Sequence, residues 1–482
     1  MSDATATEQQ HSAQKLTFVT MTAMVVGSMV GAGVFSLPRR FAQETGVLGA
    51  LTAWVIAGTG MLMLAFVFQM LAVRKPELDA GVYAYAKAGF GEYLGFFSAF
   101  GYWASSCVGN VTYWILIMTT VGAIWPALGE GETPLAIGLS TIGIWVFYVL
   151  IRRGVKDAAV INRIVTVAKM VPILVFILLA VFALDPQVFA DNWQGPNDYG
   201  SLFEQVKGTM LVTVFVFLGV EGASVYSRHA ARREDVGRAT VLGFLMVFAV
   251  FASVTIVSYG ILPASEIAEL RQPSVGGVLE AAYGQWGKVF ISVGLIISVL
   301  GAYLAWTLMA AEVLLVAAKD KDMPRFLAKV NPATDVPTAA LLLTTILIQI
   351  VLLVASLSDD AFNFALDLTS SLSLIPFVLA AGYALKLGVR RETYDVMPAG
   401  HGRELVISAV ATFYTLFLLV AAGPKFILVS FIVYAPASVL FVMSRREQDR
   451  QLFSPRELLI LAVSVIGAVT GVVALATGWI TL

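Results

Sequence analysis

Two glycine-rich clusters lie inside long apolar stretches of the sequence and could bind a ligand through main-chain atoms. Residues 27–35 read Gly-Ser-Met-Val-Gly-Ala-Gly-Val-Phe, and residues 215–224 read Phe-Val-Phe-Leu-Gly-Val-Glu-Gly-Ala-Ser. If each cluster interrupts a helix, the free N–H groups and the positive dipole end of the second half-helix can hold a carboxylate. The unwound carbonyl groups can accept hydrogen bonds from an ammonium group. The two clusters therefore predict a site for the zwitterionic head group of an amino acid.

Among the ionisable residues that fall within apolar stretches, three are candidates for a function. A charged side chain at mid-membrane depth costs on the order of 2.5–3.5 kcal/mol by insertion scales, so such residues generally have a function. Glu221 could be a protonated carboxyl group bonded to the backbone, but its place in the second cluster favours gating or the attraction of cations. Lys169 follows Asp157 by 12 residues, which places it about 18 Å along a helix and too deep to reach the surface. Asp367, near the expected end of its stretch, could be a solvated helix cap or an attractor of cations.

The composition places most of the chain in a lipid bilayer. Of the 482 residues, 58% are hydrophobic and 13% are charged, whereas an average soluble protein has about 25% charged residues. The charges are concentrated in short segments between apolar stretches, so lipid must cover most of the apolar surface. Residues 1–14 are polar and lack the basic start of a cleaved signal peptide, which predicts a cytoplasmic tail followed by a retained span.

Several classes of protein are disfavoured by what the sequence lacks. The single cysteine, Cys107, rules out a disulfide framework within the chain. Three histidines, all outside the apolar stretches, form no metal-binding pattern, so we expect no metal and no cofactor. The sequence has no G-x-x-x-x-G-K segment for ATP and no nucleophile–base constellation, so we do not expect an enzyme. The net charge of −1 gives no reason to expect a nucleic acid partner.

Apolar stretches of about 20 residues, the length that crosses the hydrocarbon core, predict thirteen transmembrane spans. Their approximate ranges are 17–37, 47–73, 92–123, 135–151, 158–184, 206–227, 240–262, 288–318, 338–357, 364–387, 405–423, 425–444 and 458–479. Only Gly423 and Pro424 separate the spans 405–423 and 425–444. Twelve spans would result if these two form one re-entrant element.

The two glycine clusters fall in the first and sixth spans, which are five apart. Paired breaks in corresponding spans are typical of inverted-repeat transporters, in which the substrate site lies between broken helices near mid-membrane. Close helix packing through small residues is the alternative, but the matched positions and the carboxylate of Glu221 favour a site. We therefore expect an all-α polytopic membrane protein with an inverted 5+5 repeat and discontinuous spans 1 and 6. Residues 15–186 and 200–390 would form the two repeats, and residues 400–482 the C-terminal spans.

The distribution of lysine and arginine predicts the orientation of the chain. With thirteen spans, one set of loops is rich in lysine and arginine and the other set is rich in aspartate and glutamate. The positive-inside rule places the first set, and the N-terminus, in the cytoplasm, for a protein of the inner or plasma membrane. Arg39 and Arg40, after the first span, go against this rule.

Six short sequence motifs occur in the same order as in a known family of transporters. They occupy residues 31–38, 76–85, 101–110, 219–224, 305–308 and 320–324. On these motifs the chain resembles the amino acid–polyamine–organocation superfamily and, within it, the basic amino acid/polyamine antiporters, such as the arginine/ornithine and arginine/agmatine antiporters. The resemblance covers residues 15–444, and the extra span 458–479 is similar to the thirteen-span arginine/ornithine branch.

The resemblance implies a role for each matching residue. The residues that it places around the substrate head group are Met29, Gly31, Ala32, Gly33, Phe215 and Leu218. Those that it places along the substrate's side chain and cationic end are Ser105, Ser106, Asn110, Trp306 and Thr369. Phe215 is also implied as a gate, and Tyr102 and Glu221 as an outer gate pair. Lys169 matches a lysine that replaces a sodium ion in proton-coupled members, as a structural cation or a proton carrier. Alanine at position 32 and phenylalanine at position 215 depart from the arginine/agmatine exchanger, which leaves specificity for a guanidinium group open.

Three functions remain open at this point. The leading hypothesis is a secondary transporter in the lipid bilayer that exchanges cationic amino acids, arginine for ornithine or a similar amine such as lysine or agmatine, by alternating access. The second is a proton-coupled amino acid uptake permease with Lys169 as the proton carrier. The third is a membrane amino acid sensor that transports nothing, which loops of at most about 25 residues disfavour because they leave no room for a signalling domain. The oligomeric state, a homodimer included, also stays open.

Overall fold

The structure is a computed structural model that describes residues 18–78, 81–154, 158–196, 199–221, 233–358, 360–395 and 397–481. The predicted tail, residues 1–14, and the end of the second glycine cluster, residues 222–224, lie outside the described residues. Within the described ranges every regular element is a helix. In chain order these are α2 (Phe18–Met29), η1 (Gly33–Ser36), α3 (Leu37–Ala42), α4 (Val47–Arg74), α5 (Val82–Phe90), α6 (Glu92–Gly122), η2 (Pro126–Leu128), α7 (Pro134–Arg152), α8 (Ala158–Ala183), α9 (Pro186–Asp191), α10 (Leu202–Phe217), α12 (Arg233–Ser258), α13 (Ala264–Glu269), α14 (Ser274–Tyr283), α15 (Gln285–Lys319), η4 (Arg325–Ala328), α16 (Thr338–Ala355), α17 (Ala361–Arg390), α18 (His401–Arg446) and α19 (Pro455–Ala476).

Nine of the described helices are long and apolar enough to cross a membrane, and the bent pair Met21–Met29 and Gly33–Ala42 makes ten if it counts as one span. Each of the thirteen predicted spans coincides with a helix or with part of one. The predicted spans 405–423 and 425–444 are joined in α18, whose backbone leaves the helical conformation at Gly423 (φ 70°, ψ 172°). The span predicted at 206–227 corresponds to α10, which has only 16 residues. The chain is therefore an all-α, multi-pass membrane protein.

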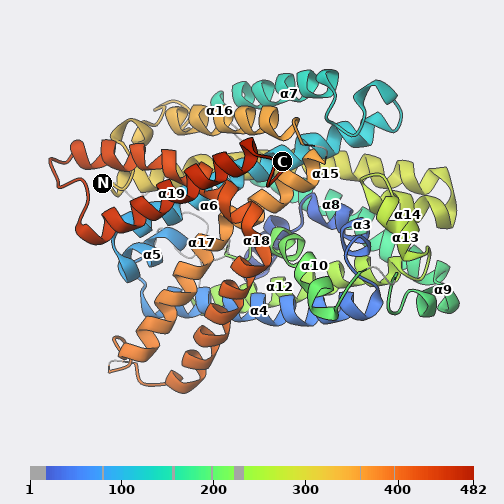
Figure 1. Ribbon diagram of the computed structural model, residues 1–482, viewed down its shortest axis with the longest axis horizontal. Coiled ribbons are helices and arrows are strands. Elements are labelled where there is room, and N and C mark those ends of the chain that lie inside the picture. The colour runs from blue at the N-terminus through green and yellow to red at the C-terminus, as the bar shows by residue number, and fades with distance from the viewer. Residues whose placement is uncertain are drawn as a thin grey trace, which may run out of the picture.

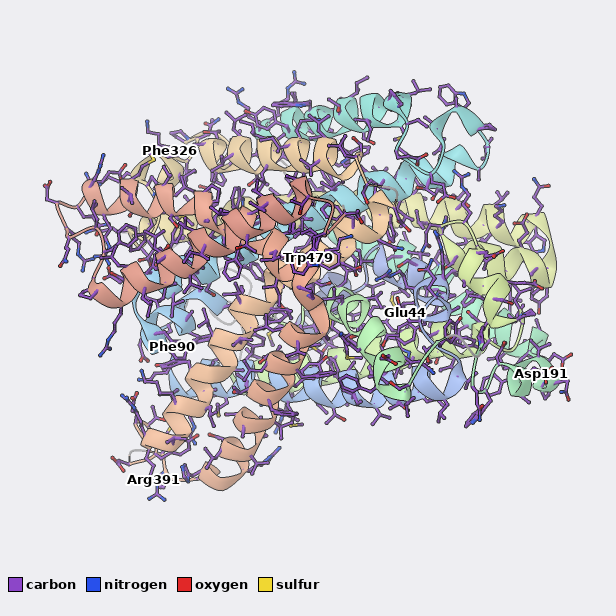
Figure 2. All side chains as sticks on the ribbon, viewed as in Figure 1. Glu44, Phe90, Asp191, Phe326, Arg391 and Trp479 are labelled. Carbon is purple, nitrogen blue, oxygen red and sulfur yellow. The ribbon has the colours of Figure 1, made fainter. Side chains whose placement is uncertain are left out.

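α6 is the central helix of the molecule. Most of its side chains are buried, and it contacts α5, α15, α16 and α17. Figure 1 shows α7 and α16 along one long side of the molecule and α4 along the opposite side, with α6 between them. The short helices α9, α13 and α14 lie at one end of the long axis, and α5 lies towards the other. Figure 2 places Phe326 and Arg391, in loops of the basic set, towards the α5 end, and Asp191, in a loop of the acidic set, at the opposite end.

A cluster of aromatic rings fixes the end of α10 to the helices behind it. The ring of Phe217, the last residue of α10, lies 6.0 Å from that of Trp54 on α4, 5.0 Å from Phe244 and 5.9 Å from Phe251 on α12 (between centroids). Trp54 in turn stacks on Phe41 of α3, with centroids 5.1 Å apart. Aromatic pairs contribute about 0.5–1.5 kcal/mol each beyond the burial of their area. This aromatic cluster therefore joins α3, α4, α10 and α12.

The two arginines that oppose the positive-inside rule are paired with acidic residues. Nη2 of Arg40 lies 2.8 and 3.0 Å from the two carboxylate oxygens of Asp367, and both residues are buried. Arg39 lies 4.0 Å from Glu130 and 3.8 Å from Asp360. Asp367 is therefore neither a solvated cap nor a free attractor of cations, because its carboxylate compensates the charge of Arg40. The pair joins α3 to α17 near the end of the molecule that carries the acidic loops.

A second ion pair lies towards the α5 end. Nζ of Lys87, on α5, lies 2.7 and 2.8 Å from the carboxylate oxygens of Asp322, just after α15. The hydroxyl of Tyr83 donates to Asp320 in the same loop, so α5 is tied to the end of α15. Burial raises the pKa of Asp322 to about 6, although the Lys87 ammonium opposes this shift.

Replacing Asp322 by asparagine should remove a pH-dependent part of the stability. The pKa of Asp322 is about 6 in the folded protein, against an ordinary value of 3.8, so the folded state binds the proton more tightly than the unfolded state does. The free energy of unfolding of the wild type should therefore rise by up to about 3 kcal/mol as the pH falls from about 7 to about 4. The measurement is the Tm of wild-type and Asp322→Asn protein in detergent over this range. The Tm of the wild type should rise relative to that of the variant at low pH. A difference in Tm that does not depend on pH would contradict the prediction.

Candidate functional site

The first glycine cluster interrupts its helix. α2 ends at Met29, and the next turn, η1, begins at Gly33 and continues into α3. The two halves are bent by 42°. Among the described residues, none accepts a hydrogen bond from the backbone amides of Gly31, Ala32 or Gly33. Three donors at the start of a half-helix are therefore free for an anionic group.

α10 ends within the second cluster, and the residues that directly follow Glu221 lie outside the described part of the chain. The helix ends at Phe217, and Gly219 has a φ of 103°, a conformation that a residue with a β-carbon adopts only under strain. A Cβ on Gly219 would also lie 2.8 Å from the carbonyl carbon of Ser28. Oγ of Ser28 donates to the carbonyl oxygens of Gly219 at 3.0 Å and of Val25 at 2.9 Å. The predicted break in the first span is confirmed. For the sixth span the structure describes the end of α10 and the turn up to Glu221, which is in direct contact with the first break.

The side chain of Glu221 accepts a hydrogen bond from the backbone of the second break. Its side chain is fully buried, and both carboxylate oxygens accept from the amide of Gly219 at 3.2 Å. The hydroxyl of Tyr102, on α6, donates to Oε1 of Glu221 at 2.7 Å, so the two residues of the predicted gate pair are bonded to each other. Tyr102 lies ten residues after the start of α6 at Glu92 and twenty before its end. Tyr102 therefore lies in the half of α6 nearer to α5.

A cavity lies between the two breaks and the helices α6, α15 and α17. Ten of the residues predicted for the site line this cavity: Met29, Gly31, Gly33, Tyr102, Ser105, Ser106, Phe215, Leu218, Trp306 and Thr369. No aspartate or glutamate occurs among the described residues of the lining. A cation in the cavity would therefore be held by aromatic rings and neutral oxygen atoms.

The other four predicted residues lie behind the cavity wall. Lys169, on α8, is buried and donates to the carbonyl oxygen of Gly27 in α2. Asn110 is fully buried, and its amide donates to Oγ1 of Thr307 at 3.2 Å. Ala32 is fully buried within the first break. The fourth residue is Glu221, whose hydrogen bonds to the second break are described above. These residues brace the wall rather than line it.

Hydroxyl groups from α6 and α17 form one part of the wall. Ser105 donates to the carbonyl oxygen of Thr369 at 2.9 Å, and its Oγ lies 2.5 Å from that of Ser373. Ser106 donates to the carbonyl oxygen of Tyr102 at 2.8 Å, and Thr369 donates to the carbonyl oxygen four residues earlier at 2.7 Å. Because the hydroxyl hydrogen atoms of Ser106 and Thr369 point to the backbone, the lone pairs of these two oxygen atoms remain available as acceptors. This part of the wall suits an ammonium or guanidinium group.

Five residues of the lining were not predicted from the sequence: Ser28, Gly109, Tyr113, Val216 and Ser373. Helical spacing could have identified three of them. Gly109 lies four residues after Ser105, Tyr113 lies seven after Ser106, and Ser373 lies four after Thr369, so each shares a helix face with a predicted residue. Ser28 and Val216 belong to the two glycine clusters, but their place in the lining depends on how the two breaks pack together.

Comparison with known proteins gives consistent matches over nearly the whole chain. A sequence profile of the amino acid permease family matches residues 16–443. The chain is 46% identical to an arginine/ornithine antiporter of Pseudomonas aeruginosa, over 98% of this chain and 100% of that protein. It is 38% identical to an L-lysine transport protein of Corynebacterium glutamicum, over 96% and 95% of the two chains. It is 34% identical to an arginine/ornithine antiporter of Latilactobacillus sakei, over 98% and 100% of the two chains.

A methyl group on Gly33 should disturb the contact between the two breaks. A Cβ there would lie 2.6 Å from Cγ1 of Val216 and 2.8 Å from Cδ1 of Phe215, so Gly33→Ala is expected to lower the free energy of unfolding by about 1–3 kcal/mol. Gly138→Ala, on α7, is the matched control, because a Cβ at Gly138 would meet no atom within 4 Å. The measurement is the Tm of both purified variants in detergent. Equal Tm values would contradict the close packing at Gly33.

Proposed function

We propose that the chain exchanges cationic amino acids across a cell membrane. It belongs to the amino acid permease family of the amino acid–polyamine–organocation superfamily, and this membership supports the proposal. The proposed exchange is arginine for ornithine, or for a similar amine such as lysine or agmatine, by alternating access. The observation that carries the proposal is the cavity between two contacting helix breaks. The names of the full-length relatives, two arginine/ornithine antiporters and an L-lysine transport protein, support this substrate class.

The head group of the amino acid would be held by main-chain atoms of the two breaks. The free amides of Gly31, Ala32 and Gly33 would donate to the carboxylate, which the positive end of the half-helix also attracts. The carbonyl oxygens of Met29 and Leu218 accept no backbone hydrogen bond from another described residue. They are therefore available to the α-ammonium group.

The cationic end of the substrate would be held without a carboxylate. The indole of Trp306 lines the cavity, and cation–π contacts are worth about 2 kcal/mol or more when the cation is desolvated. The hydroxyl oxygens of Ser105, Ser106 and Thr369 supply neutral acceptors in the same cavity. Fixed dipoles and rings suit both a guanidinium and a primary ammonium group, which supports the exchange of arginine for ornithine.

Two groups are proposed as gates. The Tyr102–Glu221 hydrogen bond joins α6 to the second break, so its rupture would open the cavity towards the α5 end. Phe215, which lines the cavity beside Gly33, is the second proposed gate. Rocking of the broken helices against α6 and its neighbours would expose the site to each side in turn.

The topology also belongs to the proposal. The N-terminus is placed in the cytoplasm, residues 15–186 and 200–390 form the two inverted repeats, and residues 400–482 add the C-terminal spans. Arg39 and Arg40, which lie outside the basic set of loops, are paired with acidic residues. The cavity is built from one chain, so the exchange requires no second copy even if the protein forms a homodimer.

Exchange can be tested by uptake of labelled arginine into liposomes that contain the purified full-length protein. The lumen is loaded in turn with buffer, ornithine, lysine, agmatine or a neutral amino acid. Arginine uptake should require a cationic substrate inside. Uptake into empty liposomes driven by a proton gradient would instead indicate the proton-coupled permease, with Lys169 as its proton carrier. Binding of arginine without any flux would indicate a sensor.

Removal of the Trp306 indole should weaken binding of the cation. In Trp306→Ala, the Kd for arginine is expected to rise about 30-fold, which corresponds to the loss of about 2 kcal/mol. The matched control is Trp145→Ala on α7, because that indole is 37% exposed on the outside of the molecule. The measurement is equilibrium binding in detergent, with Tm as the check of folding. An unchanged Kd for Trp306→Ala would contradict the role of this ring.

A further inference from the structure

The hydroxyl group of Tyr113 faces the cavity without a protein partner. Tyr113 lies on α6 and lines the cavity, although only 6% of the residue is exposed. Within the described part of the chain, no hydrogen bond joins its hydroxyl to another residue. In contrast, the hydroxyls of Tyr93 and Tyr102 on the same helix are bonded to Ser438 and Glu221. Buried polar groups rarely lack a partner, so a ligand is the expected partner of Tyr113.

This hydroxyl lies against the first helix break. The position of a Cβ on Gly31 is 3.0 Å from the hydroxyl oxygen of Tyr113 and 3.7 Å from the nearest ring carbons. The oxygen is therefore the part of the side chain that contacts the break, next to the free amides that begin at Gly31. The start of a half-helix has a positive potential. Since a phenol keeps its proton at neutral pH, the Tyr113 hydroxyl adds one more donor at this place.

The cavity thus has two ends of different chemistry. Ser106 lies seven residues before Tyr113 on α6, which separates the two positions by about 11 Å along the helix. The hydroxyl oxygens near Ser106 are acceptors, whereas the group at Tyr113 is a donor beside other donors. A carboxylate complements the Tyr113 end and a cationic group complements the other. The reverse placement would put a cation against the positive end of the half-helix.

We propose that the Tyr113 hydroxyl donates a hydrogen bond to the α-carboxylate of the substrate, and that the site thereby selects α-amino acids over amines that lack this group. The inference rests on the proposed function and narrows its substrate class. Arginine, ornithine and lysine can use every donor at the first break. Agmatine has the guanidinium group of arginine but no carboxylate, so Tyr113 contributes nothing to its binding.

The test compares arginine with agmatine in wild-type and Tyr113→Phe protein. Equilibrium binding of both compounds to the full-length protein is measured in detergent, together with arginine–ornithine exchange in liposomes. The Kd for arginine should rise about tenfold or more, because a hydrogen bond to a charged group is lost, whereas the Kd for agmatine should not change. Tyr93→Phe is the matched control, because it removes a buried hydroxyl of α6 that is bonded to Ser438 instead of facing the cavity. It should leave both Kd values unchanged.

Each outcome decides between the inference and its alternatives. A role of Tyr113 at the guanidinium end would raise the Kd of arginine and of agmatine equally, and either this result or no change would overturn the inference alone. Wild-type protein that neither binds nor exchanges arginine would overturn the proposed function together with the inference. If Tyr113→Phe fails to fold, competition for the site is measured on the wild-type protein instead. Arginine should compete more strongly than agmatine or arginine methyl ester, and equal competition would also overturn the inference.

Discussion

A helix within a bilayer must hydrogen-bond its own backbone, and this requirement decides where the chain can be interrupted. In this protein the two interruptions supply partners for each other. Ser28 of the first break donates to the carbonyl oxygen of Gly219 in the second, and Glu221 accepts from the amide of the same glycine. Lys169 donates to a carbonyl oxygen of α2 just before the first break. The amides from Gly31 onward are left without such partners among the described residues, so the remaining hydrogen-bonding capacity of the breaks is directed at the cavity.

No aspartate, glutamate, lysine or arginine occurs among the described residues that line the cavity. Arg40 and Asp367 form a buried pair at one end of the bundle, and Lys87 and Asp322 form another towards the other end. Each pair joins an element next to the cavity helices: α3 to α17, and α5 to the end of α15. A neutral cavity with rings and hydroxyl oxygens can bind a cation without the strong desolvation penalty of a fixed carboxylate. It can also release that cation, which a carrier has to do on every cycle.

Much of this arrangement could be read from the sequence, because membrane helices follow strong rules. The apolar stretches located the helices, and the glycine clusters located both breaks, since irregular backbone is tolerated at that depth only beside a cavity. The structure adds three details for reasons that a linear sequence does not contain. Asp367 is paired with Arg40, a partner 327 residues away. Asn110 is turned towards Thr307 and does not line the cavity. Tyr102 and Glu221 lie on the α5 side of the site, which depends on where the second break meets α6.

The aromatic cluster behind the second break has a mechanical consequence. Phe217 ends α10 between rings contributed by α4 and α12, and Trp54 extends the contact to α3. Rings packed at interior density cannot slide past one another without leaving voids. A displacement of the α10 end would therefore carry α3, α4 and α12 with it as one solid body. The helices that bear the hydroxyl wall, α6 and α17, contribute no ring to this cluster, although the ion pair of Arg40 with Asp367 joins α17 to α3. A movement of the wall relative to the cluster would therefore have to break this ion pair.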